Sequence, residues 1–353
     1  MSSVNFYDGT KLLNMRDRNG NQPEILFSIS NRGAGKTYFF AKHMIEKYEQ
    51  EGKKFALMCR YGTKELGSVA DGIFKAFLQN ERHGCSVSEK ICQKGVYSEV
   101  ILTRPTEDKK TETCKIGYVL PINSSDSLKR ISSTFVDVDL MFFDEFQCDN
   151  YVPDEVSKFI NIHFTVARGN KEGVRFVPVI LASNSLSIVN PYFVALGIAT
   201  KIQSNTKYYK GDGLVLERFT NFEVAERQKE SPFNRAFSKS RQVQSNIDNS
   251  WLNDSWALVG KPDAWGRALY VCTLIDGDKQ YGVRYYPQMG YYFINRKIDK
   301  SCPSIYNLSV DGVENVPLIK NTLVLRNLKN GYGKGIVRFS DISVKDVMSL
   351  IVI

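Results

Sequence analysis

The chain has 353 residues, of which 42% are hydrophobic and 24% are charged, and its formal net charge at pH 7 is +9. This length and composition leave room for two globular domains with buried cores. We expect no membrane segment, because no apolar run approaches the roughly 20 residues that a spanning helix needs. The amino terminus does not resemble a signal peptide. The seven cysteines are scattered and form no CxxC pair, which favours reduced thiols inside a cell.

The positive charge is weighted toward the carboxy-terminal part of the chain. Residues 207–353 carry 21 Lys+Arg against 15 Asp+Glu, whereas residues 1–206 carry 26 against 23. A basic surface attracts polyanions such as nucleic acids, because binding releases counterions. Many basic proteins bind no nucleic acid, so the charge alone does not identify a partner.

The first strong pattern is a buried strand at 25–30 followed by an amphipathic helix at 37–51. The segment "SNRGAGKT" lies between them. Glycines in such a loop let the backbone N–H groups face a phosphate, while Lys36 reaches the β- and γ-phosphates and the Thr37 hydroxyl binds Mg²⁺. The predicted nucleotide-contacting residues of this P-loop are Ser30, Asn31, Arg32, Gly33, Ala34, Gly35, Lys36 and Thr37.

The loop departs from the usual P-loop pattern in two ways. Ser30 stands where the pattern has its first glycine, and Arg32 adds a second cation beside the phosphates. The alternative is an ordinary glycine turn before a helix. We favour the P-loop, because strand, Gly-Lys-Thr and helix occur in the order that phosphate binding requires.

Strands and helices continue to alternate through the first 200 residues. Further strands are predicted at 55–60, 100–103, 117–121, 140–144 and 177–183, and further helices at 68–80 and 154–167. This alternation predicts an α/β domain with a mainly parallel sheet. The polar segment 103–115 is predicted to be a hairpin tip or a mobile loop. Four cations are candidates for nucleic-acid contacts, with a solvated surface as the alternative: Lys109, Lys110, Lys129 and Arg130.

The segment "VDLMFFDEF" supplies the acidic partners that a P-loop needs. Asp144 would hold the magnesium ion, and Glu145 would orient and polarise the attacking water. A glutamate at this position indicates an ATPase of the additional-strand, catalytic-glutamate class rather than a small GTPase. The strand at 177–183 is followed by Asn184, which would contact the γ-phosphate or the water; simple strand termination is the alternative.

The helix at 154–167 is expected to pack on the sheet through one apolar face. The residues of that face are Val156, Phe159, Ile160 and Phe164. Arg168 follows the helix at the edge of the domain. It is predicted either to act as an arginine finger that stabilises transition-state charge, or to cap the carboxy-terminal end of the helix.

The pattern of the sequence changes after about residue 205, where the alternation of strands and helices ends. We predict a P-loop ATPase motor domain at 1–205, a linker or helical region at 206–255 and a β-rich domain at 256–353. Asp276-Gly277-Asp278 and Met289-Gly290 are predicted hairpin turns in the last domain.

Four blocks together resemble one family. They are "SNRGAGKTYFF", "CRYGTKEL", "FFDEFQCDNYVPDEVSKFINIHFTVARGN" and "LASNSLSIVNPYF", and they resemble the DNA-packaging ATPases of phi29-like tailed bacteriophages, relatives of terminase large subunits. The resemblance implies a RecA/terminase-like P-loop domain and a degenerate RNase H-like second domain. It also implies a homomeric ring, generally a pentamer, on the portal of an empty capsid in the host cytoplasm. Such a ring uses ATP and Mg²⁺ to drive double-stranded DNA inward, and a packaging RNA or the portal would contact the second domain.

The resemblance also implies roles for particular residues. Lys36 and Thr37 match the phosphate and magnesium ligands, Asp144 and Glu145 match the acidic pair, and Arg168 matches an arginine finger that acts on a neighbouring subunit.

Two other functions remain open from the sequence. One is a terminase with an active nuclease, which needs several carboxylates converging on two metal ions. The carboxylates of the last domain are Asp263, Asp276, Asp278, Asp299, Asp311 and Glu314. Most of them lie in turns flanked by Gly, Pro or Asn, so we expect no cleavage. The other is an ATP-gated scaffold that binds nucleic acid without moving it.

Overall fold

The computed structural model describes residues 6–345, apart from 107, 109, 149, 169–172, 174, 189, 200, 203–205, 252–265, 278, 310–311 and 341–343. The chain divides into two compact units, the first made of residues 1–186 and 204–252 and the second of residues 187–203 and 253–353. Within the described ranges, every helix is too short or too polar to cross a membrane.

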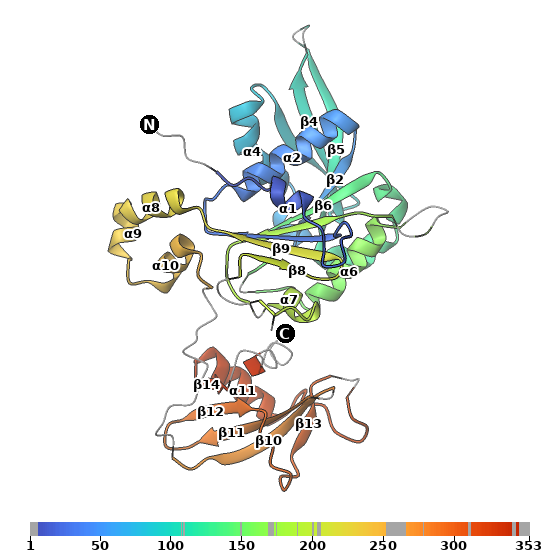
Figure 1. The fold of residues 1–353 in the computed structure, drawn as a ribbon. Coiled ribbons are helices and arrows are strands. Elements are labelled where there is room, and N and C mark those ends of the chain that lie inside the picture. Colours follow the sequence, from blue (N-terminus) through green and yellow to red (C-terminus); the bar gives the residue numbers. More distant parts are fainter. Residues whose placement is uncertain are drawn as a thin grey trace. The chain divides into compact units, whose positions relative to one another are not determined.

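The first unit is built on a nine-stranded sheet in the order β3-β4-β5-β2-β6-β7-β1-β9-β8 (Figure 1). The six strands from β5 to β9 in this order run parallel, whereas β3, β4 and β8 are antiparallel to their neighbours. The strands are β1 (Ile25–Ser30), β2 (Lys54–Cys59), β3 (Ser86–Cys92), β4 (Tyr97–Pro105), β5 (Thr111–Pro121), β6 (Val138–Asp144), β7 (Val179–Ser183), β8 (Tyr208–Lys210) and β9 (Leu214–Phe219).

Helices follow the parallel strands and cover their apolar side chains. The helices are α1 (Thr10–Asn14), α2 (Lys36–Glu51), α3 (Gly62–Glu65), α4 (Val69–Glu81), α5 (Ser125–Lys129), α6 (Glu155–Val166), α8 (Phe222–Glu230), α9 (Pro232–Ala236) and α10 (Arg241–Asp248), with 3₁₀ turns at Ile122–Ser124 and Ser132–Phe135. Phe40 of α2 and Phe74 of α4 pack with strand residues such as Phe55 and Phe142 in one buried cluster. The central strands are buried on both faces, which explains their nearly continuous apolar sequences.

The predicted α/β architecture is confirmed, and the described residues of the polar segment 103–115 lie at the end of the β4–β5 hairpin, where Pro105 pairs with Thr111. The predicted apolar face of α6 is wrong in part. Phe159 and Ile162 are buried, but Ile160 is 43% exposed and Phe164 is 63% exposed. The buried positions of α6 include 159, 162 and 166, a helical i, i+3, i+7 stripe. Positions 160 and 164 lie beside that stripe and reach solvent.

The predicted boundary at residue 205 also differs from the structure. Residues 214–219 were expected to be helical, but they form β9, which pairs in parallel with β1 through Ile25 and Leu214. The charged residues of "LVLERF" obscure its buried strand character: Glu217 is buried and accepts a hydrogen bond from the Tyr7 hydroxyl at 2.8 Å. The helical part begins at Phe222.

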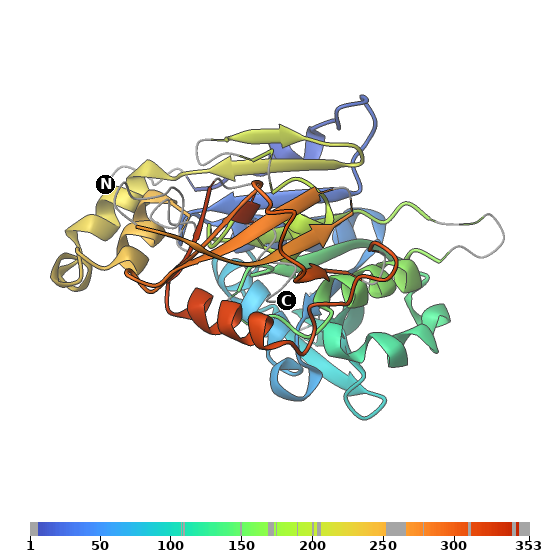
Figure 2. The same ribbon diagram turned by 90° about the horizontal axis from the view of Figure 1, so that it is seen from below.

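The second unit contains a five-stranded sheet in the order β13-β10-β11-β12-β14. Its elements are α7 (Pro191–Ala195), β10 (Leu269–Asp276), β11 (Lys279–Tyr286), β12 (Tyr291–Asn295), β13 (Ile305–Asn307), α11 (Leu323–Gly333) and β14 (Val337–Phe339). The strands β10, β11 and β12 form an antiparallel meander, and the predicted hairpin turn at Met289-Gly290 is confirmed. At the other predicted turn Asp276 pairs with Lys279, while Asp278 lies outside the described residues. Helix α11, the red helix in Figure 2, packs on one face of this five-stranded sheet through Leu325 and Leu328.

Candidate active site

The loop between β1 and α2 adopts a conformation that requires glycine at two positions. Gly33 has φ 77° and Gly35 has φ 104°, both in the left-handed region that side chains disfavour. A Cβ atom on Gly33 would lie 3.2 Å from Nε2 of Gln228, and one on Gly35 would lie 3.3 Å from Cβ of Phe6. The close neighbours and the backbone angles together explain both glycines.

The segment that follows β9 forms one wall of this loop. The Asn31 side chain accepts a hydrogen bond from the Asn221 N–H at 2.9 Å and donates one to the Asn221 carbonyl at 3.1 Å. Gln228 Nε2 donates to the Arg32 carbonyl at 2.9 Å, and the Arg32 N–H donates to the Asn246 carbonyl at 3.2 Å. The sequence indicated only a charged helical linker here, because nothing in its pattern shows contacts with a loop so distant along the chain.

Lys36 is buried at the amino-terminal end of α2, with only 7% of its surface exposed. Its Nζ donates to Ser30 Oγ at 2.6 Å, to Asn184 Oδ1 at 3.3 Å and to the Ser30 carbonyl at 3.5 Å. Burial lowers the pKa of Lys36 to about 8, although the nearby carboxylates of Asp144 and Glu145 raise it. Phosphate oxygens would therefore meet a desolvated cation.

The acidic pair lies directly beside the loop. Asp144 is the last residue of β6, and its Oδ2 accepts a hydrogen bond from Thr37 Oγ1 at 2.7 Å. Burial raises the pKa of Asp144 above its ordinary value. Its Oδ1 accepts from the N–H of Glu145, which is exposed and has φ 54°. Hydroxyl and carboxylate oxygens are suitable ligands for Mg²⁺.

Arg60 holds the backbone on the carboxy-terminal side of the acidic pair. Its guanidinium donates to the Glu155 carboxylate at 3.0 and 3.1 Å, to the Glu145 carbonyl at 2.9 Å and to the Phe146 carbonyl at 2.6 Å. These contacts give it a packing role that fixes Glu145 in its strained backbone conformation. The sequence did not identify Glu155 as a partner of the site. Its position at the start of α6 was the one indication that the sequence offered.

A cavity of about 400 Å³ joins these groups. Ser183 Oγ at the tip of β7 is buried and has no hydrogen-bond partner within the described residues. The lining residues are Arg32, Gly33, Ala34, Gly35, Lys36, Thr37, Tyr38, Gly72, Ile73, Ala76, Asp144, Glu145, Ser183 and Asn184. The P-loop, the acidic pair and Asn184, predicted separately from the sequence, therefore surround one space.

The other predicted residues lie apart from this cavity. Arg168 is exposed just after α6, and its Nη1 donates to Ser132 Oγ at 3.3 Å. Lys110 and Arg130 are exposed, and Lys129 forms an ion pair with Asp126 at 3.6 Å. Lys109 lies outside the described residues.

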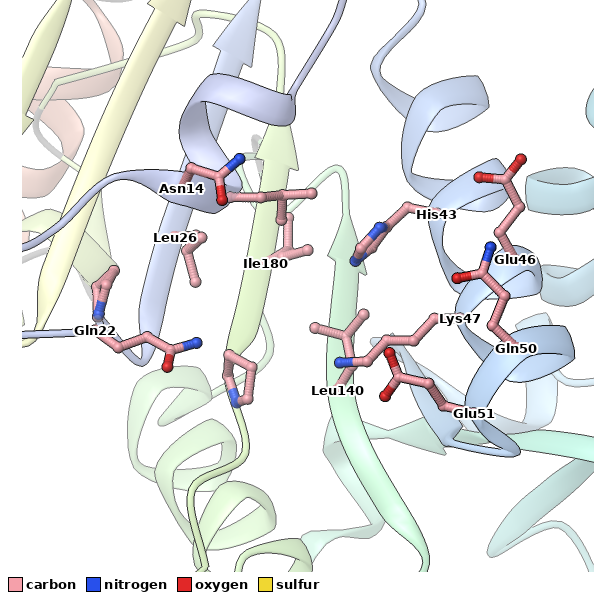
Figure 3. A pocket seen from close by; sticks show the side chains of 13 residues that line it. Asn14, Gln22, Leu26, His43, Glu46, Lys47, Gln50, Glu51, Leu140 and Ile180 are labelled. Carbon is pink, nitrogen blue, oxygen red and sulfur yellow. The ribbon is translucent and has the colours of Figure 1, made fainter.

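A second cavity of about 360 Å³ lies near the amino-terminal ends of the central strands β1, β6 and β7, which contribute Leu26, Leu140 and Ile180 to its wall (Figure 3). The stretch of α2 from 43 to 51 forms another part of the wall, where Figure 3 shows His43, Lys47 and Glu51. Burial and the neighbouring Lys47 lower the pKa of His43. This cavity shares no residue with the P-loop, so we assign it no part in nucleotide binding.

The sheet order identifies the class of protein. Strand β7 lies between the P-loop strand β1 and the acidic strand β6, and a glutamate follows the aspartate at the end of β6. These features define a P-loop NTPase fold of the additional-strand, catalytic-glutamate class. Residues 1–352 match the family described as Podovirus DNA encapsidation protein (Gp16), and the chain belongs to this family.

Individual relatives agree with this membership and confirm the resemblance found in the sequence. The chain is 26% identical over 350 residues to the DNA packaging protein of Bacillus phage phi29, covering 97% of this chain and 95% of that protein. It resembles the Phi-28 gp11 DNA packaging motor with a TM-score of 0.58 and 16% identity, covering 99% of this chain and 98% of that one. For a chain of the bacteriophage Phi-29 viral genome packaging motor assembly the TM-score is 0.54 and the identity 22%, with 98% of both chains covered. At these identities the two structures show a shared fold.

Proposed function

We propose that this protein is an ATP-driven translocase that packages double-stranded DNA into a preformed capsid, working as a homomeric ring, generally a pentamer, at the portal. The observation that carries the proposal is the convergence of Lys36, the Thr37–Asp144 pair and Glu145 on one cavity. Family membership supplies the DNA-packaging context. The ring would package the DNA in the host cytoplasm, while it is bound to the capsid.

Each group has a defined task in this proposal. The loop N–H groups and Lys36 bind the phosphates, and Asn184 lies where it can contact the γ-phosphate or the attacking water. Thr37 and Asp144 would hold Mg²⁺, which neutralises charge on the phosphates. Glu145 accepts the proton of the attacking water. Arg168 is not among the residues that line the cavity of its own chain, and in this proposal it acts on the cavity of a neighbouring subunit.

The proposal is tested by measuring ATP turnover on portal-bearing capsids with and without double-stranded DNA. We expect DNA to stimulate turnover, and Lys36→Ala to abolish nucleotide binding because the phosphate charge loses its partner. Lys47→Ala, on the same helix but outside the P-loop cavity, is the control and should behave as wild type. Turnover that DNA does not change would favour the ATP-gated scaffold.

The second unit carries the surface that we propose for a polyanion, either DNA or a packaging RNA. Residues 316–340 contain five Lys or Arg and no Asp or Glu. Lys320, Arg326, Lys329 and Lys334 are exposed on or beside α11. We expect binding to fall log-linearly with salt, and Arg326→Ala and Lys329→Ala each to reduce the slope by about 1, as for a lost phosphate contact. Lys279→Ala in the β10–β11 hairpin is the control; equal slopes for all variants would place the interface elsewhere.

We also expect no DNA cleavage by the full chain with Mg²⁺ or Mn²⁺. Among the described residues, no three His, Cys, Asp or Glu side chains are placed to hold a metal ion. The Asp299 carboxylate accepts hydrogen bonds from the N–H and hydroxyl of Ser301. Asp263, Asp278 and Asp311 lie outside the described residues. Reproducible metal-dependent nicking by the purified protein would favour the terminase with an active nuclease.

A further inference from the structure

Ser30 makes the shortest hydrogen bond of the P-loop lysine through an atom that glycine lacks. It is the last residue of β1 and is fully buried. Its hydroxyl donates to the Asn31 carbonyl at 3.0 Å, which leaves an oxygen lone pair for Lys36 Nζ at 2.6 Å. The departure from the P-loop pattern therefore creates a specific contact with the phosphate-binding cation.

The ammonium group of Lys36 has three uncharged acceptors in the protein, and the Ser30 hydroxyl is the nearest of them. It lies at 2.6 Å from Nζ, whereas Asn184 Oδ1 and the Ser30 carbonyl lie at 3.3 and 3.5 Å, farther than in an ordinary hydrogen bond. An ammonium group has three N–H donors. A phosphate oxygen that binds this group closely therefore competes for these donors, above all with the Ser30 hydroxyl.

We propose that Ser30 is a positioning residue that holds the ammonium group of Lys36 inside the nucleotide-free loop and competes with the nucleotide phosphates for it. The proposal deepens the proposed function, because it assumes that the loop binds nucleotide phosphates. A hydrogen bond that exists only without nucleotide stabilises the empty site, so it weakens nucleotide binding and favours product release. Glycine at this position would leave the lysine free for the phosphates.

The first test measures ADP binding at equilibrium. Ser30→Ala and Ser30→Gly both remove the hydroxyl, and we expect about tenfold tighter binding, the scale of a hydrogen bond to a charged group. Ser30→Thr keeps a hydroxyl and should retain wild-type affinity. Ser28→Ala is the matched control, because Ser28 is also buried in β1 but its hydroxyl donates to Tyr7.

The second test is a double-mutant cycle on the protein without nucleotide. The free energy of unfolding is measured by chemical denaturation for Ser30→Ala, Lys36→Met and the double variant. If the Ser30 hydroxyl binds the ammonium group of Lys36, the two substitutions should be non-additive, because the second one removes a contact that the first has already broken. Ser28→Ala combined with Lys36→Met is the control and should be additive, because the Ser28 hydroxyl donates to Tyr7.

The outcomes separate this proposal from the proposed function. ADP binding that is unchanged or weaker in both hydroxyl-free variants overturns the competition between Ser30 and the phosphates. Additive effects of Ser30→Ala and Lys36→Met on the free energy of unfolding overturn the contact itself. If the wild-type protein binds no ADP while the two substitutions are non-additive as expected, the contact with Lys36 stands and nucleotide binding by this loop is refuted.

Discussion

Glu145→Gln is expected to slow ATP hydrolysis at least ~10²-fold while ATP still binds, because glutamine cannot accept the proton of the attacking water. The side chain is exposed at the cavity, and the Arg60 guanidinium and the Asp144 carboxylate hold its backbone from two sides. The substitution is isosteric and leaves these backbone contacts in place. Single-turnover hydrolysis and equilibrium ATP binding, measured on the same preparation, separate the two effects.

The control for this experiment is Glu46→Gln, because Glu46 lies on α2 and lines the second cavity, away from the P-loop. It should hydrolyse ATP at the wild-type rate. Near-normal hydrolysis in Glu145→Gln would show that Glu145 takes no part in the hydrolysis step. The acidic strand would then have only a magnesium-binding role.

Arg168→Ala is expected to lower turnover by ~10³-fold or more, the scale known for arginine fingers. Its own P-loop cavity is lined by other residues, and its exposed guanidinium donates one hydrogen bond within the described residues, to Ser132 Oγ at 3.3 Å. An exposed arginine at this position is available to a neighbouring subunit. Mixing Arg168→Ala with Glu145→Gln should restore part of the activity, because some interfaces then pair an intact Glu145 with an intact Arg168.

The mixing experiment needs rings that form and exchange subunits, which native mass spectrometry can verify. Arg18→Ala, which removes an exposed arginine ion-paired with Asp212, is the control and should not lower turnover. Exchange without any recovery of activity would mean that Arg168 acts within its own subunit or only at the end of α6.

The parts of the fold that were predictable from the sequence are those governed by local patterns. The strand 25–30 and the start of α2 follow from an apolar run, two glycines and helical spacing, and the structure agrees with them. Strand β9 was missed because its burial depends on pairing with β1, far away in sequence. The exposed positions of α6 were assigned to the core because periodicity alone does not distinguish a wide apolar face from a buried stripe with apolar neighbours.

The active site shows the same limit. The loop and the acidic pair each have a local signature, so the sequence alone identifies their residues. The contact between Arg60 and Glu155 joins residues 95 positions apart, and the wall formed by Gln228 joins residues 196 positions apart. Neither pair has a spacing rule that a single sequence reveals. The sequence does not predict the role proposed for Ser30, because a departure from a motif does not show what the new side chain contacts.

The hydrogen bonds from residues 221–246 to the P-loop have a practical consequence for dividing this protein into fragments. A truncated protein that ends at residue 205 would keep every signature residue of the ATPase, yet it would lack β9 and the partners of Asn31 and Arg32. It would also present the unpaired edge of β1, which invites aggregation. An autonomous nucleotide-binding fragment should therefore extend at least through Asn249, whose side chain donates to the Phe219 carbonyl and the Thr220 hydroxyl and so joins the end of α10 to the end of β9.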